Sequence, residues 1–441
     1  MKRLIAIFII FTMVILGGLV FAQNDTSQHI RSIARSDFGL YAAVGDGGLI
    51  ITSEDATSWK KVSMEASGNL NGVIWAMGRF VAVGDEGIIL TSLDGKDWAK
   101  TGSIKGTIDL FSVASSGKEI IATGNDGTVL ISKDGVSWEQ RRMATAERIN
   151  RVRWINDRYI AVGGAMLILT STDGVTWDEV KAEPSSTIMF TDVAWDGDKY
   201  VVVGDHLSIW VSKDGKAWTQ DESILKKDEM DYTLCIYSIV WTGDKFVAVG
   251  QKGIILYSND GSDWYREAEV TRKVLKDIIY SNNKFVVIGD RGSILTSEDG
   301  SKWVNHNSIS AQSNEINLKV DEQKLLNIIL NHPYGESEDI TKETLFEVID
   351  GKDLLSVDRD GTMKANGVGH AIVKATYDYE TIEVSVRVES STTVQSENND
   401  NRDEGNNKAN NSTKLSDVLL TLGGVFAVIT LITISIKKGN S

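Results

Sequence analysis

Short apolar runs recur along most of the chain, and each ends in glycine before a polar turn and a second apolar run. Phe80–Gly84, Tyr200–Gly204 and Phe246–Gly250 are three examples. Both faces of such a strand are apolar, as in strands buried between two neighbouring layers. Each unit predicts four short strands joined by tight turns in which glycine supplies a positive φ. In the second unit we expect these strands at about 71–76, 79–84, 87–92 and 97–102.

The apolar runs alternate with the motif S-x-D-G-x-x-W, whose first copy is degenerate and has Ala56 in place of the glycine. The seven tryptophans of the motif are 39, 40, 39, 41, 46 and 39 residues apart. A period of this length with turn signals in every unit predicts a β-propeller, here of seven blades over residues 28–308. The motif residues are Asp55, Asp94, Asp134, Asp173, Asp214, Asp260 and Asp299, with Trp59, Trp98, Trp138, Trp177, Trp218, Trp264 and Trp303.

This motif resembles the Asp-box, or BNR, repeat of sialidase-like propellers. The whole unit is similar to the seven-bladed family that includes the photosystem II stability/assembly factors. The resemblance implies that the motif is structural, with the aspartate accepting backbone hydrogen bonds in its turn and the tryptophan packing. Side-chain chemistry agrees, because a short Asp side chain readily bonds its own turn amides. Carboxylates at seven equivalent turns are also poor candidates for catalysis, which needs one asymmetric site.

Residues 314–389 change to strict alternation of apolar and polar residues, typical of half-buried antiparallel strands. Ile316, Leu318 and Val320 form one such stretch, and 382–388 another. The segments 355–363 and 367–376 resemble the group 2 bacterial immunoglobulin-like domain, which implies a small β-sandwich used as a spacer or adhesive module. The spacer interpretation is favoured. The fold class expected is therefore all-β, a propeller followed by a small sandwich.

The two ends of the chain predict export and anchoring. Residues 1–22 have a basic start and an apolar stretch, as a signal peptide has, although an uncleaved membrane helix is the alternative. Residues 418–436 carry no charge and would span roughly 28 Å as a transmembrane helix. The lysines of the tail, 437–441, are expected in the cytosol, which leaves the preceding domains extracellular at the cell membrane. The polar segment 390–416 is expected to be a disordered linker.

Composition narrows the possible functions. The formal net charge of −15 argues against nucleic-acid binding, which needs a basic surface. A single cysteine, Cys235, excludes an intrachain disulfide and a CxxC metal site, and five histidines make a His-rich metal centre improbable. No metal site or cofactor is predicted, although calcium on the acidic rim stays open.

A binding site is expected at the end of the propeller that carries the turns between second and third strands and the connections between blades. That end varies most along the repeat. A ring of polar groups around a central funnel there would suit a polar ligand, a peptide or a sugar. The alternative is that these residues are ordinary turn residues and solvated arginines. The candidates are Asp46, Asp85, Arg151, Asp205, His206, Asp290 and Arg291.

Two functions are compatible with this sequence. The first is a membrane-anchored, non-catalytic binding or scaffold protein that presents a propeller face to an extracellular protein or polysaccharide. The alternative is a sialidase-like glycoside hydrolase. Sialidases carry an Arg-Ile-Pro-like motif early in the chain, and Arg31-Ser32-Ile33 does not match it. Glycoside hydrolysis requires two carboxylates at a fixed separation, and no pair stands out here. The binding function is therefore preferred.

Overall fold

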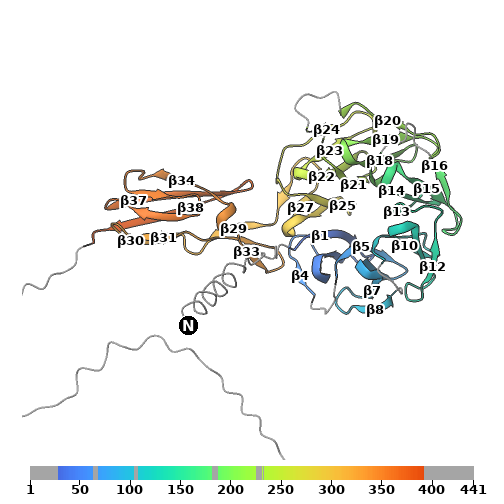
Figure 1. The fold of residues 1–441 in the computed structure, drawn as a ribbon, viewed down its shortest axis with the longest axis horizontal. Helices are drawn as coiled ribbons and strands as arrows, with labels where there is room; N and C mark the ends of the chain where they lie inside the picture. The colour runs from blue at the N-terminus through green and yellow to red at the C-terminus, as the bar shows by residue number, and fades with distance from the viewer. Residues whose placement is uncertain are drawn as a thin grey trace, which may run out of the picture. The chain divides into compact units, whose positions relative to one another are not determined.

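The computed structural model describes residues 28–391, apart from 63–67, 104–107, 181–186, 225–230 and 232. The expected signal peptide, most of the expected linker, the expected transmembrane helix and the tail lie outside these residues. Within the described ranges we find no helix with the length and apolar character needed to cross a membrane. The fold is all-β, and its first part consists of radial sheets around a common axis (Figure 1).

Seven antiparallel four-stranded sheets form the propeller, and we number them as blades 1 to 7 in chain order. Each blade consists of four consecutive strands, of which the first is innermost. The strands of blades 1 to 4 are β1 (Ile30–Arg35), β2 (Tyr41–Gly45), β3 (Ile50–Ser53) and β4 (Lys60–Lys61); β5 (Leu70–Ala76), β6 (Arg79–Gly84), β7 (Ile88–Ser92) and β8 (Ala99–Ser103); β9 (Leu110–Ser115), β10 (Ile120–Gly124), β11 (Thr128–Ser132) and β12 (Glu139–Arg142); β13 (Ile149–Ile155), β14 (Arg158–Gly163), β15 (Ile168–Ser171) and β16 (Asp178–Val180). Those of blades 5 to 7 are β17 (Phe190–Trp195), β18 (Tyr200–Gly204), β19 (Ile209–Ser212) and β20 (Thr219–Gln220); β21 (Ile236–Trp241), β22 (Phe246–Gly250), β23 (Ile255–Ser258) and β24 (Tyr265–Arg266); β25 (Leu275–Ser281), β26 (Lys284–Gly289), β27 (Ile294–Ser297) and β28 (Val304–Asn305).

The predicted propeller is confirmed, and in the second unit the four strands lie within two residues of their expected bounds. The second strand of a blade is buried on both faces, as in β2, where all five residues are buried. The reason is that apolar side chains of one blade pack into the next, so that β2 and β6 share a core cluster. Blade 1 in turn shares a cluster with blade 7, and β1 contacts β25, which closes the circle.

Each second strand ends in a glycine because a neighbouring backbone carbonyl leaves no room for a side chain. At Gly84 a Cβ atom would lie 2.0 Å from the carbonyl oxygen of Asn69, the residue before the innermost strand of the same blade. This carbonyl accepts the N–H of Asp85, which holds the turn after β6 against the start of β5. The backbone at Gly84 is extended, so steric access and not φ selects glycine. The equivalent glycines 45, 124, 163, 204, 250 and 289 would meet the corresponding oxygen at 2.0–2.2 Å.

A one-turn 3₁₀ segment joins the second and third strands of every blade, and its middle residue has a positive φ. These segments are η1 (Asp46–Gly48), η2 (Asp85–Gly87), η3 (Asn125–Gly127), η4 (Gly164–Met166), η5 (Asp205–Leu207), η7 (Gln251–Gly253) and η8 (Asp290–Gly292). The middle position is not restricted to glycine, since Glu86, His206 and Arg291 occupy it with φ of 54°, 58° and 51°. Side-chain identity there is therefore free to vary from blade to blade.

A second β module follows the propeller and has its own core, which includes Ile328, Met363, Val373 and Val384. Its sheets are β29-β32-β33, β30-β38-β37-β34 and β31-β36-β35, and β30 pairs with β38 in parallel. The strands are β29 (Ser308–Ala311), β30 (Glu315–Lys319), β31 (Gln323–Leu325), β32 (Ile328–Asn331), β33 (Ser337–Asp339), β34 (Leu345–Asp350), β35 (Leu355–Val357), β36 (Thr362–Ala365), β37 (Gly369–Tyr377) and β38 (Glu380–Glu389), with a 3₁₀ segment, η9 (Thr341–Glu343).

The substitution Gly84→Ala tests the space requirement. The new methyl group must displace a hydrogen-bonded backbone, so we expect the free energy of unfolding to fall by about 1–3 kcal/mol. Chemical denaturation of the full chain measures this loss. The control is Gly47→Asp at the middle of η1, where nothing lies within 4 Å and blade 3 already carries Asp126. A variant Gly84→Ala that is as stable as Gly47→Asp would contradict the steric explanation.

Candidate functional site

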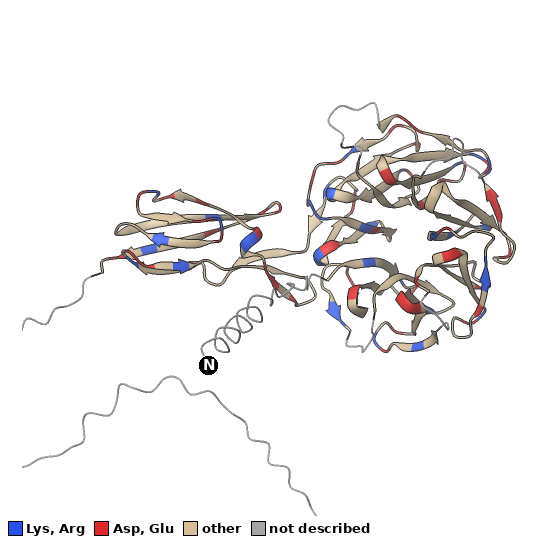
Figure 2. Ribbon diagram, in the orientation of Figure 1, with Lys and Arg blue, Asp and Glu red and all other residues tan. Residues whose placement is uncertain are grey.

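The seven innermost strands line a central channel, and consecutive ones contact each other around the circle. They align so that each contributes one equivalent residue at each level. We call the residues of the middle level the central ring. Acidic and basic residues both occur on these inner strands (Figure 2). The central ring consists of Ser32, Gly72, Ser112, Arg151, Asp192, Ser238 and Asp277.

Four side chains of the central ring accept a hydrogen bond from the backbone of the next blade. Asp277 of blade 7 accepts the N–H of Ile33 of blade 1 at 3.2 Å, so this bond closes the circle. The innermost strand has no further strand on its channel side, and these side chains satisfy amides that would otherwise need water. The other three bonds run from Val73 to Ser32 at 3.2 Å, from Val152 to Ser112 at 3.1 Å and from Ile239 to Asp192 at 3.1 Å.

Two carboxylates and two guanidinium groups meet in the central channel. Arg153 binds Asp192 through Nε at 2.8 Å and Nη2 at 2.6 Å, and Arg151 Nη2 lies 3.0 Å from Asp277. The Ser238 hydroxyl lies 2.9 Å from an oxygen of each carboxylate. Burial favours the neutral acid, but Arg153 and Arg151 outweigh it and lower the pKa of Asp192. The network is electrically balanced, which is how buried charges are tolerated.

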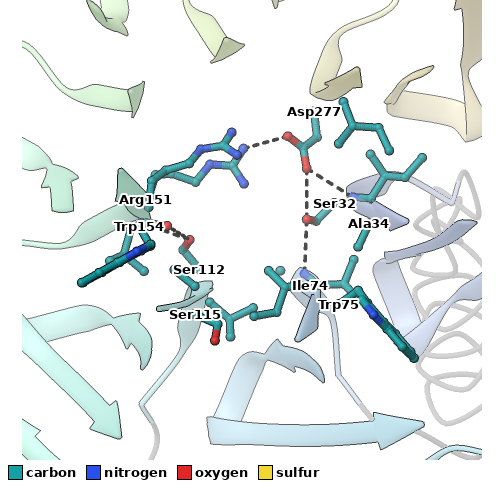
Figure 3. Close-up of a pocket in the computed structure, with 17 residues that line it drawn as sticks. Ser32, Ala34, Ile74, Trp75, Ser112, Ser115, Arg151, Trp154 and Asp277 are labelled. Carbon is teal, nitrogen blue, oxygen red and sulfur yellow. Dashed lines mark hydrogen bonds and ion pairs between the residues drawn. The ribbon is translucent and has the colours of Figure 1, made fainter. Parts of the chain in front are cut away.

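One cavity opens on the channel end that carries the S-x-D-G-x-x-W turns, and it has a volume of about 340 Å³ (Figure 3). It is lined by blades 1 to 4 and 7, where small residues such as Gly72 leave space. Figure 3 shows Arg151 reaching toward Asp277, which also binds Ser32. The polar groups Ser32, Ser112 and Asp277 are thus already engaged in bonds within the protein.

A second cavity, of about 210 Å³, opens at the opposite end of the channel, where the 3₁₀ turns lie. We call it the turn-face mouth. Four cationic residues line it, namely Arg31, Arg148, Arg151 and Lys276, and no carboxylate does so in the described part of the chain. The equivalent residues of the seven inner strands form its rim; they are Arg31, Asn71, Phe111, Asn150, Thr191, Tyr237 and Lys276.

Three of the predicted acidic residues lie directly behind this rim. The Asp46 carboxylate pairs with Arg31, and the Asp85 carboxylate accepts a hydrogen bond from Asn71 at 2.8 Å. The Asp290 carboxylate lies 3.8 Å from Lys276 Nζ. These acids orient rim side chains and do not themselves line the cavity.

The other candidates are dispersed. Arg151 lies in the central ring and borders both cavities. Asp205 lies beside the buried Cys235. Burial raises the pKa of the Cys235 thiol, and the Asp205 carboxylate raises it further. His206 is exposed at the middle of η5. Arg291 points to the second β module, where it binds Glu343 at 2.8 Å. The predicted set therefore does not form one site.

Of the described residues that line the turn-face mouth, the predicted set contains Arg151 but lacks Arg148, Phe111 and Lys276. The Arg148 guanidinium stacks on the Phe111 ring at 3.6 Å from its centroid. Burial and the neighbouring Arg31 charge lower the pKa of Arg148. Aligning the second residue of every inner strand would have revealed the rim, because this position is polar or aromatic in all seven blades.

Each S-x-D-G-x-x-W turn uses its carboxylate internally. In blade 3 the Asp134 carboxylate accepts the N–H groups of Val136 at 2.8 Å and Ser137 at 2.7 Å, and the Ser132 hydroxyl at 3.0 Å. The backbone bonds from Ser137 and Val136 lower the pKa of Asp134 to about 2. The pKa values of Asp55, Asp94, Asp173, Asp214, Asp260 and Asp299 are lowered as well.

Six of the seven motif tryptophans pack on an aromatic ring of their own blade, and the exception is Trp138, where blade 3 has Ile120 in place of the aromatic partner. In blade 6 the Trp264 ring lies 6.3 Å from Phe246, which in turn lies 4.6 Å from Trp241 of the innermost strand. Among the described residues, no cluster of three or more His, Cys, Asp or Glu side chains is arranged to hold a metal ion.

Comparison with known proteins identifies the fold alone. No family model matches the chain, and no curated protein matches it. Among solved structures, the chain is similar to "YCF48 bound to D1 peptide", with a TM-score of 0.53 and 16% identity over 62% of this chain and 92% of that one. It is also similar to YCF48 from Cyanidioschyzon merolae, with a TM-score of 0.51 and 17% identity over 62% and 96%. Both comparisons support a β-propeller.

The lowered pKa values predict acid sensitivity of the propeller. A carboxylate whose folded pKa lies below its unfolded value stabilises the fold above the unfolded pKa, and this stabilisation is lost as the pH falls through the folded pKa. For Asp134 the window runs from its ordinary value of 3.8 down to about 2. We expect Asp134→Asn to show a smaller loss of stability between pH 5 and pH 2 than the parent chain, measured by urea denaturation.

The control for this prediction is Asp126→Asn, an exposed acid at the middle of η3 outside the motif. It should keep the acid dependence of the parent chain. An acid dependence that is the same in all three proteins would argue against a contribution from the Asp134 turn.

Proposed function

We propose that this protein is a non-catalytic binding or scaffold protein that holds an acidic peptide segment of a partner at the turn-face mouth. The observation that carries this proposal is the cavity lined by Arg31, Arg148, Arg151 and Lys276, without a lining carboxylate among the described residues, in a chain of net charge −15. Cationic groups that line a concave site attract anionic ligands, although Asp46 and Asp290 behind the rim offset part of this charge.

Arg148 is the cation best placed to bind an anion. Arg31 is paired with Asp46, and Arg151 with Asp277. Arg148 has no ion pair within the described ranges. Burial and the charge of Arg31 lower its pKa, and the nearby Asp109 and Asp85 carboxylates partly offset them. A ligand carboxylate between the two guanidinium groups would relieve that repulsion and accept charge-assisted hydrogen bonds.

The lining favours a peptide over a simple anion. Phe111, Met189 and Tyr237 offer apolar and aromatic surface beside the cationic groups, which suits acidic side chains interspersed with apolar ones. One of the structures of similar fold is YCF48 bound to a D1 peptide. That ligand belongs to the other protein, and the similarity adds only that a propeller of this fold can bind a peptide.

We further propose that the mouth faces the outside of the cell. The expected signal peptide at 1–22 and transmembrane helix at 418–436 support export and anchoring in the cell membrane, with 390–416 as a tether. Resemblance of the repeat to Asp-box propellers, and of 314–389 to bacterial immunoglobulin-like domains, supports a surface protein of modular construction.

Glycoside hydrolysis is the second candidate, and the channel chemistry does not favour it. Asp192 and Asp277 are two carboxylates that lie close together in the channel, since the Ser238 hydroxyl contacts both. Their side chains are 0% and 4% exposed and are bound to arginines. A general acid needs a raised pKa, whereas the pKa of Asp192 is lowered.

Titration with a fluorescent peptide of alternating Glu and Leu residues tests the proposed binding. We expect the full chain to bind it with an affinity that decreases with salt, and Arg148→Gln to weaken binding by about tenfold or more through loss of charge-assisted hydrogen bonds. Arg141→Gln is the matched control, because Arg141 is an exposed arginine on β12 that pairs with Glu139 outside the mouth.

Equal binding by the parent chain and Arg148→Gln would contradict the proposed site. Preference for an anionic polysaccharide over the peptide would contradict the proposed ligand. Turnover of fluorogenic sialosides that is abolished by Asp192→Asn would favour the hydrolase instead.

A further inference from the structure

The seam between blades 7 and 1 is the place where the circle closes. Each blade is built from its own four consecutive strands, so no strand is shared across this seam. Bonds between the two blades themselves include Ile33 to Asp277 and a weak contact of Arg35 Nη1 with Ser281 at 3.3 Å. At every other seam the chain itself passes from one blade to the next, whereas here closure depends on noncovalent contacts alone.

A hairpin of the second β module occupies this seam. Residues 332–336 connect β32 to β33, and the Tyr334 side chain is buried in the core cluster shared by blades 1 and 7. Trp59 and Ile51 are two of the blade 1 residues in this cluster. The blade 7 members are Val286, Ile288 and Ile294. Tyr334 is 6% exposed, so its ring is part of the propeller core although it belongs to the module.

Polar contacts fix the hairpin to blade 1, and close packing holds it against blade 7. On the blade 1 side, the backbone N–H of Trp59 donates to the carbonyl oxygen of Pro333 at 3.4 Å, and the Lys61 ammonium group pairs with the Glu336 carboxylate. The His332 ring stacks on Tyr334 with centroids 5.2 Å apart. On the blade 7 side, a Cβ atom at Gly292 would lie 2.4 Å from the Tyr334 hydroxyl oxygen, so η8 and the tyrosine are in close contact.

A second point of attachment lies on blade 7 and on the connection that leads to it from blade 6. The turn between β37 and β38 carries Asp378, whose carboxylate accepts from Thr271 Oγ1 at 2.5 Å and from Arg272 N–H at 2.6 Å. Arg291 of η8 donates to the Tyr377 hydroxyl at 2.9 Å and forms two bonds of 2.8 Å with Glu343. Two separate attachment points restrict rotation of the module, which a single hinge would allow.

We propose that the second β module is a clasp that closes the propeller. Tyr334 bridges blades 7 and 1, Glu343 fastens the module to blade 7, and Asp378 fastens it to the connection between blades 6 and 7. The module is then an integral part of the propeller and not a spacer that is attached only through the end of the last strand of blade 7. This proposal does not depend on what the turn-face mouth binds. It concerns the seam, and its test measures local opening of the blades.

Hydrogen exchange followed by mass spectrometry on the full chain tests the clasp. Removing the Tyr334 ring by Tyr334→Ala should accelerate exchange in β2–β3 and β26–β27 by about tenfold or more, since loss of a buried aromatic is strongly destabilising. Exchange in β14–β15 of blade 4 should stay unchanged. Tyr334→Phe should behave like the parent chain, because the buried Tyr334 hydroxyl has no hydrogen-bond partner among the described groups.

Leu345→Ala, at a position of the module that is 70% exposed, is the control for general effects of substitution in the module. If Tyr334→Ala does not fold, Asp378→Ala provides the second test, with faster exchange expected for 270–275 and η8 only. Acceleration confined to the module, or uniform across all blades, would overturn the proposal. So would unchanged exchange at the seam in Tyr334→Ala, or unchanged exchange at 270–275 and η8 in Asp378→Ala.

Discussion

The hydrogen bond from a central-ring side chain to the backbone of the next blade is the interaction on which this structure depends. A propeller leaves its innermost strands with amides that face the channel and have no neighbouring strand. Ser32, Ser112, Asp192 and Asp277 supply acceptors for these amides. Because the side chain and the amide belong to different blades, each bond fixes the angle between two sheets, and the bond from Ile33 to Asp277 fixes the last sheet to the first.

The same requirement shapes the channel. Carboxylates buried as acceptors need compensating cations, and Arg151 and Arg153 provide them. The resulting network occupies the channel centre and separates the two cavities. The cavity at the end with the S-x-D-G-x-x-W turns has its polar groups bound within the protein, and the other cavity is the cationic turn-face mouth. Closure at the seam also leaves blades 7 and 1 without a covalent connection, and the second β module lies where that connection is missing.

The sequence predicts contacts that lie within one repeat much better than contacts between distant segments. Geometry inside a blade determines the repeat period, the glycine at the end of each second strand and the S-x-D-G-x-x-W turn. These local features predict the propeller, which the structure confirms. The candidate site is less predictable from the sequence. The turn pattern favours Asp46 and Asp85, whereas Arg31 and Asn71 form the rim in front of them. The position of Tyr334 in the seam has no local pattern, since Trp59 of blade 1 precedes it by 275 residues and Gly292 of blade 7 by 42 residues.

Site-resolved hydrogen exchange by NMR on the parent protein tests the central claim most directly. The amides of Ile33, Val73, Val152 and Ile239 each have a central-ring acceptor on the preceding blade. Val113 is the informative exception, because its equivalent acceptor position is Gly72, which has no side chain. The account predicts slow exchange for the four amides, comparable to the neighbouring strand ladders, and exchange faster by at least about tenfold for Val113. Equal rates for Val113 and the four others, or rapid exchange at Ile33, would contradict it.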